Sequence, residues 1–312
     1  MPKSGLIATI AGLLLGGGYC APTAEAGDRF DAGAAFVVDY WGKDEGLPGG
    51  AVIAMIQTSD GYLWLGTQYG LVRFDGIRFD VYDESALPGL NSSAIACLFE
   101  DSRGNLCVGT ENAGVVLIKP GGQVHPLKIW ADTPRGKLVS ATETADGAVW
   151  LYTSDGQLCR YREDRGDVWA VGANVWSNTR LVLADDTGAL QIGTDTELRV
   201  VPSVTSMEPP NLPPPDILPI KVDFLLNSQH GGHWRLAGGR VEKWRGKVLE
   251  RDLGAYPWTN TPVATACEDS QGNLIVGTRG SGVYWYNNEN QAQRVSGRSE
   301  ERRVGKECRS RW

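Results

Sequence analysis

The chain has 312 residues and a net charge of −7, with 21% charged residues, 40 glycines and 11 tryptophans. This composition excludes an intrinsically disordered protein, because it describes a turn-rich chain with enough apolar residues for a packed core. No nucleic-acid partner is expected.

The first 26 residues read as a secretory signal. Lys3 gives a positive start, residues 6–18 form an apolar run too short to span a membrane, and residues 24–26 (A-E-A) are a signal cleavage site. We therefore expect export to the periplasm or another extracytoplasmic space. Cys20 leaves a lipid anchor open as an alternative, although the tyrosine before it is too bulky for that motif.

Residues 36–41 read as an isolated strand. Leu47-Pro48 after this strand match Leu87-Pro88, which follow a fourth strand 40 residues later. Residues 36–41 are therefore expected to be a fourth strand without its own first three.

Residues 52–82 read as a four-stranded antiparallel meander. Its strands are separated by turns at Asp60-Gly61, Tyr69-Gly70 and Asp75-Gly76. Each turn contains glycine, which takes the positive φ that tight hairpins require.

This meander recurs along the chain. The first-hairpin glycine is repeated at spacings of 43, 43, 41, 43 and 41, at Gly61, Gly104, Gly147, Gly188, Gly231 and Gly272. A period of 40 to 45 residues with four strands per unit is typical of a β-propeller. The predicted fold is an all-β propeller over residues 27–296, with six four-stranded antiparallel blades at about 52–83, 94–129, 138–172, 179–203, 221–252 and 262–296.

The ring is expected to have had at least seven blades. A fourth strand of the sixth blade is predicted near residues 292–296, so the strand at 36–41 would complete a further blade.

Residues 207–219 contain six prolines, which cannot donate strand hydrogen bonds, and are predicted to form a loop between blades four and five.

The last residues break the pattern. Residues 297–312 resemble a translated vector or adapter tail, which would make the chain a fragment; a genuine basic tail is the alternative.

Four cysteines lie between the signal and the tail and are predicted to be free and buried: Cys97, Cys107, Cys159 and Cys267. A disulfide between the first two is the alternative in an exported chain.

The motif of blade one resembles the two-component regulator propeller repeat. The resemblance rests on D-G-Y-L-W-L-G-T-Q-Y-G-L-V-R-F-D-G (residues 60–76) and the preceding W-G-K-D-E-G-L-P-G-G-A-V-I-A-M-I-Q (41–57). It covers about residues 36–286 and is strong in units one, two and six and weak in units four and five. It implies the periplasmic sensor region of a sensor or hybrid histidine kinase that responds to polysaccharide breakdown products. A kinase, membrane attachment and a homodimer would then belong to a missing C-terminal part.

The loops on one face of the propeller are the predicted ligand site. Connections from second to third strands, and from fourth strands to the next blade, share that face. Aromatic, amide and charged side chains there suit sugar rings. The predicted ligand-binding residues are Tyr69, Glu111, Asn112, Trp130, Trp176, Asn178, Trp258, Asn260 and Arg279. Loop tryptophans that only cap the packing of blades are the alternative.

Three other motifs are interpreted as structural. The D-x-x-G-N turns at 101–105 and 269–273 lack the further ligands of a calcium loop. His230 and His233 straddle a hairpin without a third ligand, so no metal or other cofactor is expected. The tryptophans at 64, 150 and 234 are predicted to pack inside blades.

The leading hypothesis is therefore a periplasmic sensor propeller that recognises a carbohydrate-like small molecule or oligosaccharide and has no catalysis of its own. Two alternatives stay open: a secreted propeller lyase or glycosidase, which would need paired carboxylates, and a propeller that serves as an interaction scaffold.

Overall fold

The computed structural model describes residues 41–48, 51–127, 136–162, 165–170, 180–202, 214–287 and 289–295. Within these ranges the protein is all-β, with six four-stranded antiparallel sheets, one short 3-10 turn η1 (Lys43–Glu45) and no α-helix. The described part of the chain contains no helix that is long and apolar enough to cross a membrane. The predicted signal peptide, the predicted tail and all but the last residue of the strand at 36–41 lie outside the described residues.

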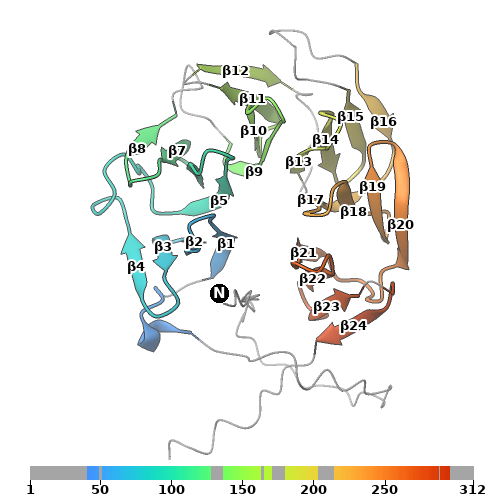
Figure 1. Cartoon of the computed structure of the whole chain (residues 1–312). Coiled ribbons are helices and arrows are strands. Elements are labelled where there is room, and N and C mark those ends of the chain that lie inside the picture. Colours follow the sequence, from blue (N-terminus) through green and yellow to red (C-terminus); the bar gives the residue numbers. More distant parts are fainter. Residues whose placement is uncertain are drawn as a thin grey trace, which may run out of the picture.

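The sheets are the blades of a propeller, and within each blade the strands pair in chain order. Figure 1 shows the six blades arranged around a centre, with the first strand of each innermost. Blades one to three comprise β1 (Val52–Gln57), β2 (Leu63–Thr67), β3 (Gly70–Phe74), β4 (Phe79–Tyr82); β5 (Ile95–Glu100), β6 (Leu106–Thr110), β7 (Val115–Ile118), β8 (Val124–Pro126); β9 (Leu138–Glu143), β10 (Val149–Thr153), β11 (Gln157–Arg162) and β12 (Arg165–Ala170). Blades four to six comprise β13 (Arg180–Ala184), β14 (Leu190–Thr194), β15 (Leu198–Val201), β16 (Asp216–Leu218); β17 (Val222–Asn227), β18 (His233–Ala237), β19 (Arg240–Arg245), β20 (Val248–Ala255); β21 (Val263–Glu268), β22 (Leu274–Thr278), β23 (Val283–Tyr286) and β24 (Ala292–Val295).

The fourth blade differs from its predicted extent. Its outermost strand is β16, which lies within the proline-rich stretch and pairs antiparallel with β15. Five of the six prolines therefore lie between the third and fourth strands of one blade and only Pro219 follows β16, so the stretch is not simply a loop between two blades as predicted. The fourth strand predicted for blade six is confirmed as β24.

The anchor glycines of the repeat share one backbone conformation. At all six positions φ lies between 76° and 92°, in the left-handed region that favours glycine. Each closes the turn between the first and second strands by donating its N–H to a carbonyl three residues earlier, as Gly61 does to Thr58 at 2.8 Å. This requirement explains why the anchor is the most regular feature of the sequence.

The Gly-Thr pair at the end of the second strand has two separate roles. The threonine hydroxyl closes the following turn: Thr67 Oγ1 donates to the Gly70 carbonyl at 2.9 Å, and Thr278 Oγ1 to that of Gly282 at 2.8 Å. The glycine leaves room for the next blade. A Cβ on Gly66 would lie 2.7 Å from Ile95 Cγ2.

The hydrophobic core consists of five clusters, and each lies between two successive blades. They join blades one and two around Ile95, two and three around Leu138, three and four around Trp150, four and five around Val222, and five and six around Trp234. The described residues form no sixth cluster between blades six and one. The tryptophans at 150 and 234 are confirmed as packing residues.

A second kind of contact links the turns of neighbouring blades. The backbone N–H and hydroxyl of Ser59 donate to the Glu100 carboxylate at 2.9 and 2.8 Å, and those of Ser102 donate to Glu143 at 2.6 and 2.7 Å. In blade five the Gln229 N–H donates to Glu268 at 2.6 Å. We call this the turn-to-carboxylate contact. In each case the acid ends the first strand of the following blade.

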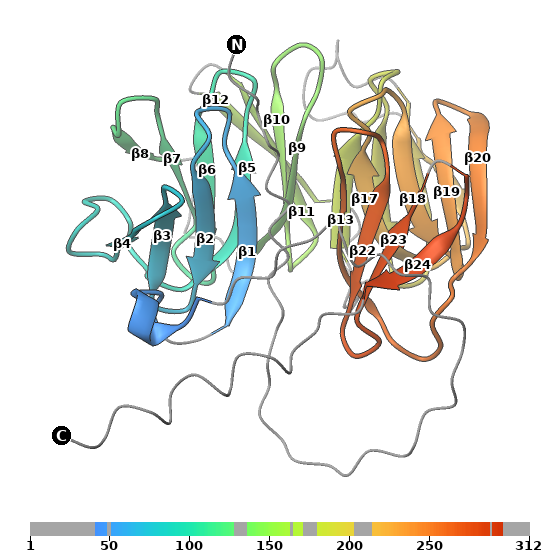
Figure 2. The ribbon, with the colours of Figure 1, turned by 60° about the horizontal axis from the view of Figure 1, so that its bottom comes forward.

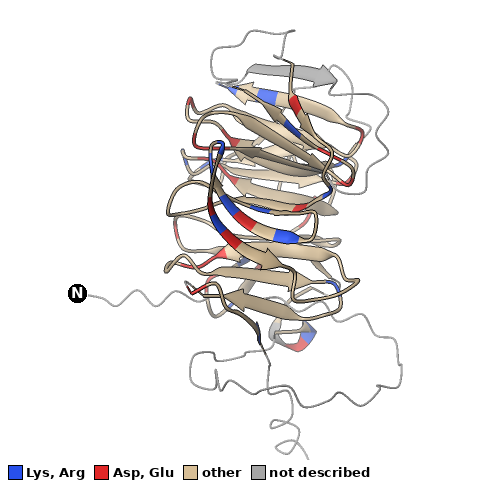
Figure 3. Ribbon diagram, turned by 90° about the vertical axis from the view of Figure 1, so that its right-hand side faces the viewer, with Lys and Arg blue, Asp and Glu red and all other residues tan. Residues whose placement is uncertain are grey.

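The outer strands of blade five carry alternating charges (Figure 3). Arg240 pairs with Asp252, and Arg245 with Glu250, across strands β19 and β20. Exposed ion pairs of this kind contribute little to stability, but charges on an outer strand discourage edge-to-edge pairing with other sheets.

Candidate functional site

The described part of the predicted ligand face is divided among three blades. Tyr69 lies between β2 and β3, Glu111 and Asn112 between β6 and β7, and Asn260 and Arg279 on the loops that flank β21 and β22. The predicted Trp130, Trp176 and Asn178 lie outside the described residues.

Trp258 lies in the predicted loop, between β20 and β21, but its ring is buried. It is only 6% exposed, stacks on Tyr256 with ring centroids 4.6 Å apart, and contacts Tyr284 at 4.8 Å. The loop between β20 and β21 folds this ring into the core between blades five and six, so the structure assigns it the packing role that was the alternative in the sequence.

Tyr69 is the exposed aromatic residue among the described members of this face. It is 60% exposed, and its backbone N–H donates to Thr67 Oγ1 at 3.0 Å, which fixes the turn while leaving the ring free. In the neighbouring blade Glu111 pairs with Lys137 at 3.3 Å. The face therefore carries an open aromatic ring on blade one and an ion pair that joins blades two and three, groups of the kinds that contact the CH surface and the hydroxyls of a sugar.

Asn260 and Arg279 lie together at the sixth blade. The Arg279 N–H donates to the Pro262 carbonyl at 3.0 Å, and the Thr261 and Ser281 hydroxyls are 2.5 Å apart. Asn260 has φ 55°, which asparagine tolerates better than most residues. These contacts join the two loops and leave both predicted side chains exposed.

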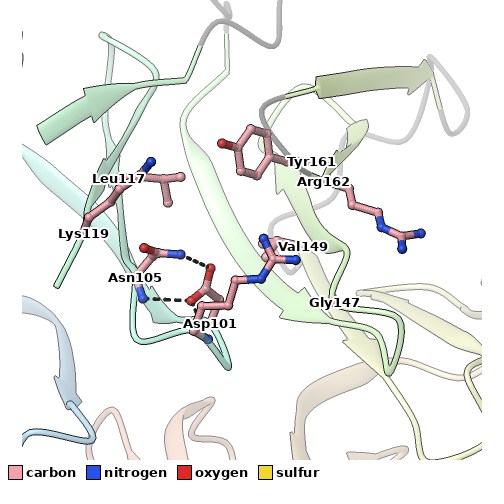
Figure 4. A pocket seen from close by; sticks show the side chains of 9 residues that line it. Asp101, Asn105, Leu117, Lys119, Gly147, Val149, Tyr161 and Arg162 are labelled. Carbon is pink, nitrogen blue, oxygen red and sulfur yellow. Dashed lines mark hydrogen bonds between the residues drawn. The ribbon is translucent and has the colours of Figure 1, made fainter.

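A groove opens at the opposite end of the blades, between blades two and three (Figure 4). Its volume is about 240 Å³, and its lining comes from turns and strand ends: Asp101, Arg103, Asn105, Leu117, Lys119, Gly147, Val149, Tyr161 and Arg162. Figure 4 shows the Tyr161 ring facing the strand that carries Leu117 and Lys119.

The groove is rich in cationic groups. Asp101 is occupied within its own turn, accepting from the Asn105 N–H at 2.8 Å and the Asn105 amide at 2.7 Å. Arg162 pairs with Asp146 at 3.4 Å. Arg103 and Lys119 have no carboxylate partner within the described residues, so these two cations are available to an anionic group. The sequence contains one indication of this cationic groove. Arg103 stands at a repeat position where blades one and three carry aspartate, so blade two has a positive charge in place of a negative one.

The D-x-x-G-N turns, which the sequence analysis interpreted as structural, form hydrogen bonds within their own turns in the structure. Asp269 accepts from the Asn273 N–H at 2.9 Å and its amide at 2.8 Å, as Asp101 does in its own turn. None of the four described cysteines forms a disulfide within the described residues, as predicted; Cys107 and Cys159 are buried, but Cys97 is half-buried and Cys267 is exposed, so the expectation that all four are buried was wrong for Cys267. Burial raises the pKa of the Cys97 thiol to about 12.

His233 belongs to a buried polar chain between blades four and five. Its Nε2 accepts from the Gln191 amide at 2.8 Å, and the same amide donates to Asp185 at 3.2 Å. Burial, assisted by the nearby Arg235, lowers the pKa of His233 to about 4. The ring is therefore neutral at physiological pH and joins the two blades. His230, its partner in the sequence motif, is exposed and lies 3.9 Å from Glu268.

The structural comparisons place this fold among known propellers. The chain superposes on virginiamycin B lyase from Staphylococcus aureus with a TM-score of 0.61 and 13% identity, covering 78% of this chain and 84% of the lyase. It superposes on the extracellular domain of the hybrid two component system BT4673 from B. thetaiotaomicron with a TM-score of 0.60 and 18% identity, covering 84% of this chain and 34% of that one. For PorZ, a surface component of the type-IX secretion system of Porphyromonas gingivalis, the values are 0.54 and 15%, covering 74% and 39%.

The protein is thus a β-propeller by fold, and at these identities the likeness extends to the fold alone. No curated protein sequence matches the chain. Residues 46–69 match the family model described as two component regulator propeller, which confirms the repeat recognised in blade one. The chain spans about a third of the length of the BT4673 domain.

Proposed function

We propose that this propeller is the extracytoplasmic ligand-sensing domain of a two-component signalling protein and recognises a carbohydrate-like ligand. The observation that carries the proposal is the two component regulator propeller repeat at residues 46–69. The shared fold with the BT4673 extracellular domain supports the same class. In this proposal the chain binds and does not catalyse, and the signal is passed on by a further part of the receptor.

The exposed Tyr69 ring and its polar neighbours support a sugar as the ligand class. An open aromatic face beside charged and amide groups offers apolar contact and hydrogen bonds together. The groove with Arg103 and Lys119 is a second place where such a ligand could bind, provided that it carries carboxylate groups.

Thermal shift with two oligosaccharides tests the proposal: a neutral xylo-oligosaccharide and a carboxylated oligogalacturonate. A ligand at about 100 times its Kd stabilises the folded state by about 2.7 kcal/mol, which is readily measured as a rise in Tm. We expect a rise with at least one of the two, and no product by chromatography. Product formation would replace sensing with catalysis, and no shift with either would contradict recognition of these sugars.

Variants locate the site. Tyr69→Ala should abolish the shift if the predicted face binds, and Arg103→Gln should abolish it if the groove binds. Ile77→Ala is the matched control, because Ile77 is 83% exposed but lies in the turn between β3 and β4, away from both places. A shift that survives both test variants would place the site elsewhere.

A further inference from the structure

The groove between blades two and three gathers more positive charge than the same place elsewhere in the ring. Three repeat positions meet there: the residue before the anchor glycine, and the residue at the outgoing end of the third strand in each of the two blades. Here they are Arg103, Lys119 and Arg162. Between blades one and two they are Asp60, Asp75 and Lys119, and every other pair of successive blades carries a single lysine or arginine at these positions. The repeat therefore does not require three cations, and they are particular to this groove.

The carboxylates around the groove are used by the protein itself. Asp101 is bonded within its own turn, as described above. Glu143 accepts from the Ser102 N–H and hydroxyl at 2.6 and 2.7 Å. Asp146 accepts from the Thr144 hydroxyl at 2.6 Å. These acids hold the turns of the two blades in place.

Two cationic side chains of the groove have no such role. The Arg103 guanidinium and the Lys119 ammonium bond no carboxylate among the described residues, whereas Arg162 pairs with Asp146 at 3.4 Å. The whole chain carries a net charge of −7, so this is a local concentration of positive charge and not part of a basic surface. Both groups suit the oxygens of a carboxylate or a sulfate, and arginine can hold two of those oxygens at once.

The groove continues into a second hollow over the first hairpin of blade three. The groove has a volume of about 240 Å³ and the second hollow about 510 Å³, and both are lined by Arg103 and Gly147. A Cβ on Gly147 would lie 3.5 Å from Arg103 Nη2, so the guanidinium lies at the junction of the two hollows. Sites for drug-sized ligands have about 300–1,000 Å³. The groove is thus of a size for a single unit of a ligand, and the second hollow gives room for the chain to continue.

Tyr161 adds an aromatic wall to the groove. Its ring faces the strand that carries Leu117 and Lys119, and Leu117 is only 3% exposed (Figure 4). An aromatic ring provides an apolar surface for the CH groups of a sugar ring. A neutral sugar would use this ring but leave both cations without an anionic partner. A sugar with an acidic substituent would satisfy the ring and the cations together.

We propose that the groove binds one acidic unit of an oligosaccharide. The anionic group of this unit, a carboxylate or a sulfate, lies across Arg103 and Lys119, and its ring packs against Tyr161. The rest of the oligosaccharide continues past Gly147 into the second hollow. The proposal deepens the proposed function and rests on it for the choice of a sugar; the preference for a negative charge rests on the groove alone.

Calorimetric titration of the full chain with matched ligands tests the preference for charge. Trigalacturonate and its methyl ester share the same rings and hydroxyls, but the ester has no charge. We expect the acid to bind about tenfold more tightly or better, because charge-assisted hydrogen bonds are roughly twice as strong as neutral ones. A sulfated galactotriose, compared with galactotriose itself, shows whether sulfate serves in place of the carboxylate.

Variants place the charge preference in the groove. Arg103→Gln and Lys119→Gln should each weaken binding of the acid about tenfold and leave the affinity for the ester unchanged. Tyr161→Leu should weaken binding of both ligands. Lys247→Gln is the matched control for loss of a positive charge, since the Lys247 side chain is 88% exposed on blade five. The Tm of each variant without ligand shows that the fold is kept.

The outcomes separate this inference from the proposed function. Equal affinity for charged and neutral ligands of both pairs, unchanged by Arg103→Gln and Lys119→Gln, would overturn the inference and leave sugar sensing standing. A preference for the acid that survives both variants would also overturn it, because the anion would then bind elsewhere. Tight binding that depends on both cations, followed by release of a cleaved product, would support the site and replace sensing with catalysis. Binding of none of the four ligands would contradict both.

Discussion

At the scale of single residues, His233 makes one blade interface depend on pH. The ring accepts a hydrogen bond from Gln191, which also bonds Asp185, while Arg235 and Asp186 are the other charged groups that act on it. Burial lowers its pKa from 6.5 to about 4, so folding favours the neutral ring. The stability that this provides is fully present above pH 6.5 and is lost as the pH falls toward 4.

We therefore expect the free energy of unfolding to fall by up to about 1.4 kcal/mol for each pH unit in that window from this residue. Urea unfolding between pH 7 and 4.5 measures the slope. His233→Gln should be less stable at pH 7 and should lose this part of the slope. His125→Gln, at an exposed position of β8, should keep it. Identical slopes in the native chain and His233→Gln would show that another group titrates.

Residue roles were the hardest to predict from the sequence. Trp258 and Tyr69 are both aromatic residues in loops of the same face, yet one is buried against Tyr256 and Tyr284 and the other is open. Hydrophobicity cannot distinguish them, because the difference lies in whether the loop folds back over the blade. The cationic groove was missed for a similar reason: its lining residues come from two blades and meet only in the fold.

At the scale of elements, the second-strand glycine is predicted to matter only where another blade covers it. Gly109→Ala places a methyl group 2.6 Å from Leu138, and overpacking of this kind costs about 1–3 kcal/mol. Gly277→Ala meets only the exposed Thr265 side chain at 3.1 Å, which can rotate away, so a change below about 0.5 kcal/mol is expected.

Chemical unfolding of both variants measures the difference. The pair is matched in residue type, strand and repeat position, so only the neighbouring blade differs. Equal destabilisation would mean that the glycine is needed by its own sheet, and not by the packing between sheets.

The strands and the first hairpin of each blade could be predicted closely from the sequence. The anchor glycines need a positive φ that few other residues tolerate, so they mark every first hairpin even where the rest of the motif has diverged. Blade four was the exception. Its fourth strand has only three residues, Asp216–Leu218, with prolines on both sides, and no alternating pattern can be recognised over so short a length.

At the scale of the whole molecule, stability is expected to vary around the ring. Within the described residues, core clusters pack the central blades on both sides, whereas blades one and six each carry a cluster on one side (Figure 2). In repeat architectures the stability of a unit depends on its interfaces with neighbours. Amides of β2 and β22 should therefore exchange hydrogen faster than those of β10 and β14.

Hydrogen exchange followed by mass spectrometry tests this expectation, since local opening exposes amides at free energies below that of global unfolding. Uniform protection across all blades in the unmodified chain would show that the ring opens only as a whole.

The turn-to-carboxylate contact and the glycine space between neighbouring blades also bear on how such a ring can evolve. Blade two carries a serine turn and a glycine space on one side, at Ser102 and Gly109, and a glutamate and an aliphatic residue on the other, at Glu100 and Ile95. A gene duplication that copies one blade therefore also copies two matching half-interfaces. The duplicate can join the ring without compensating substitutions in its neighbours, so blade number can change in a single genetic step while the chemistry between blades is inherited intact.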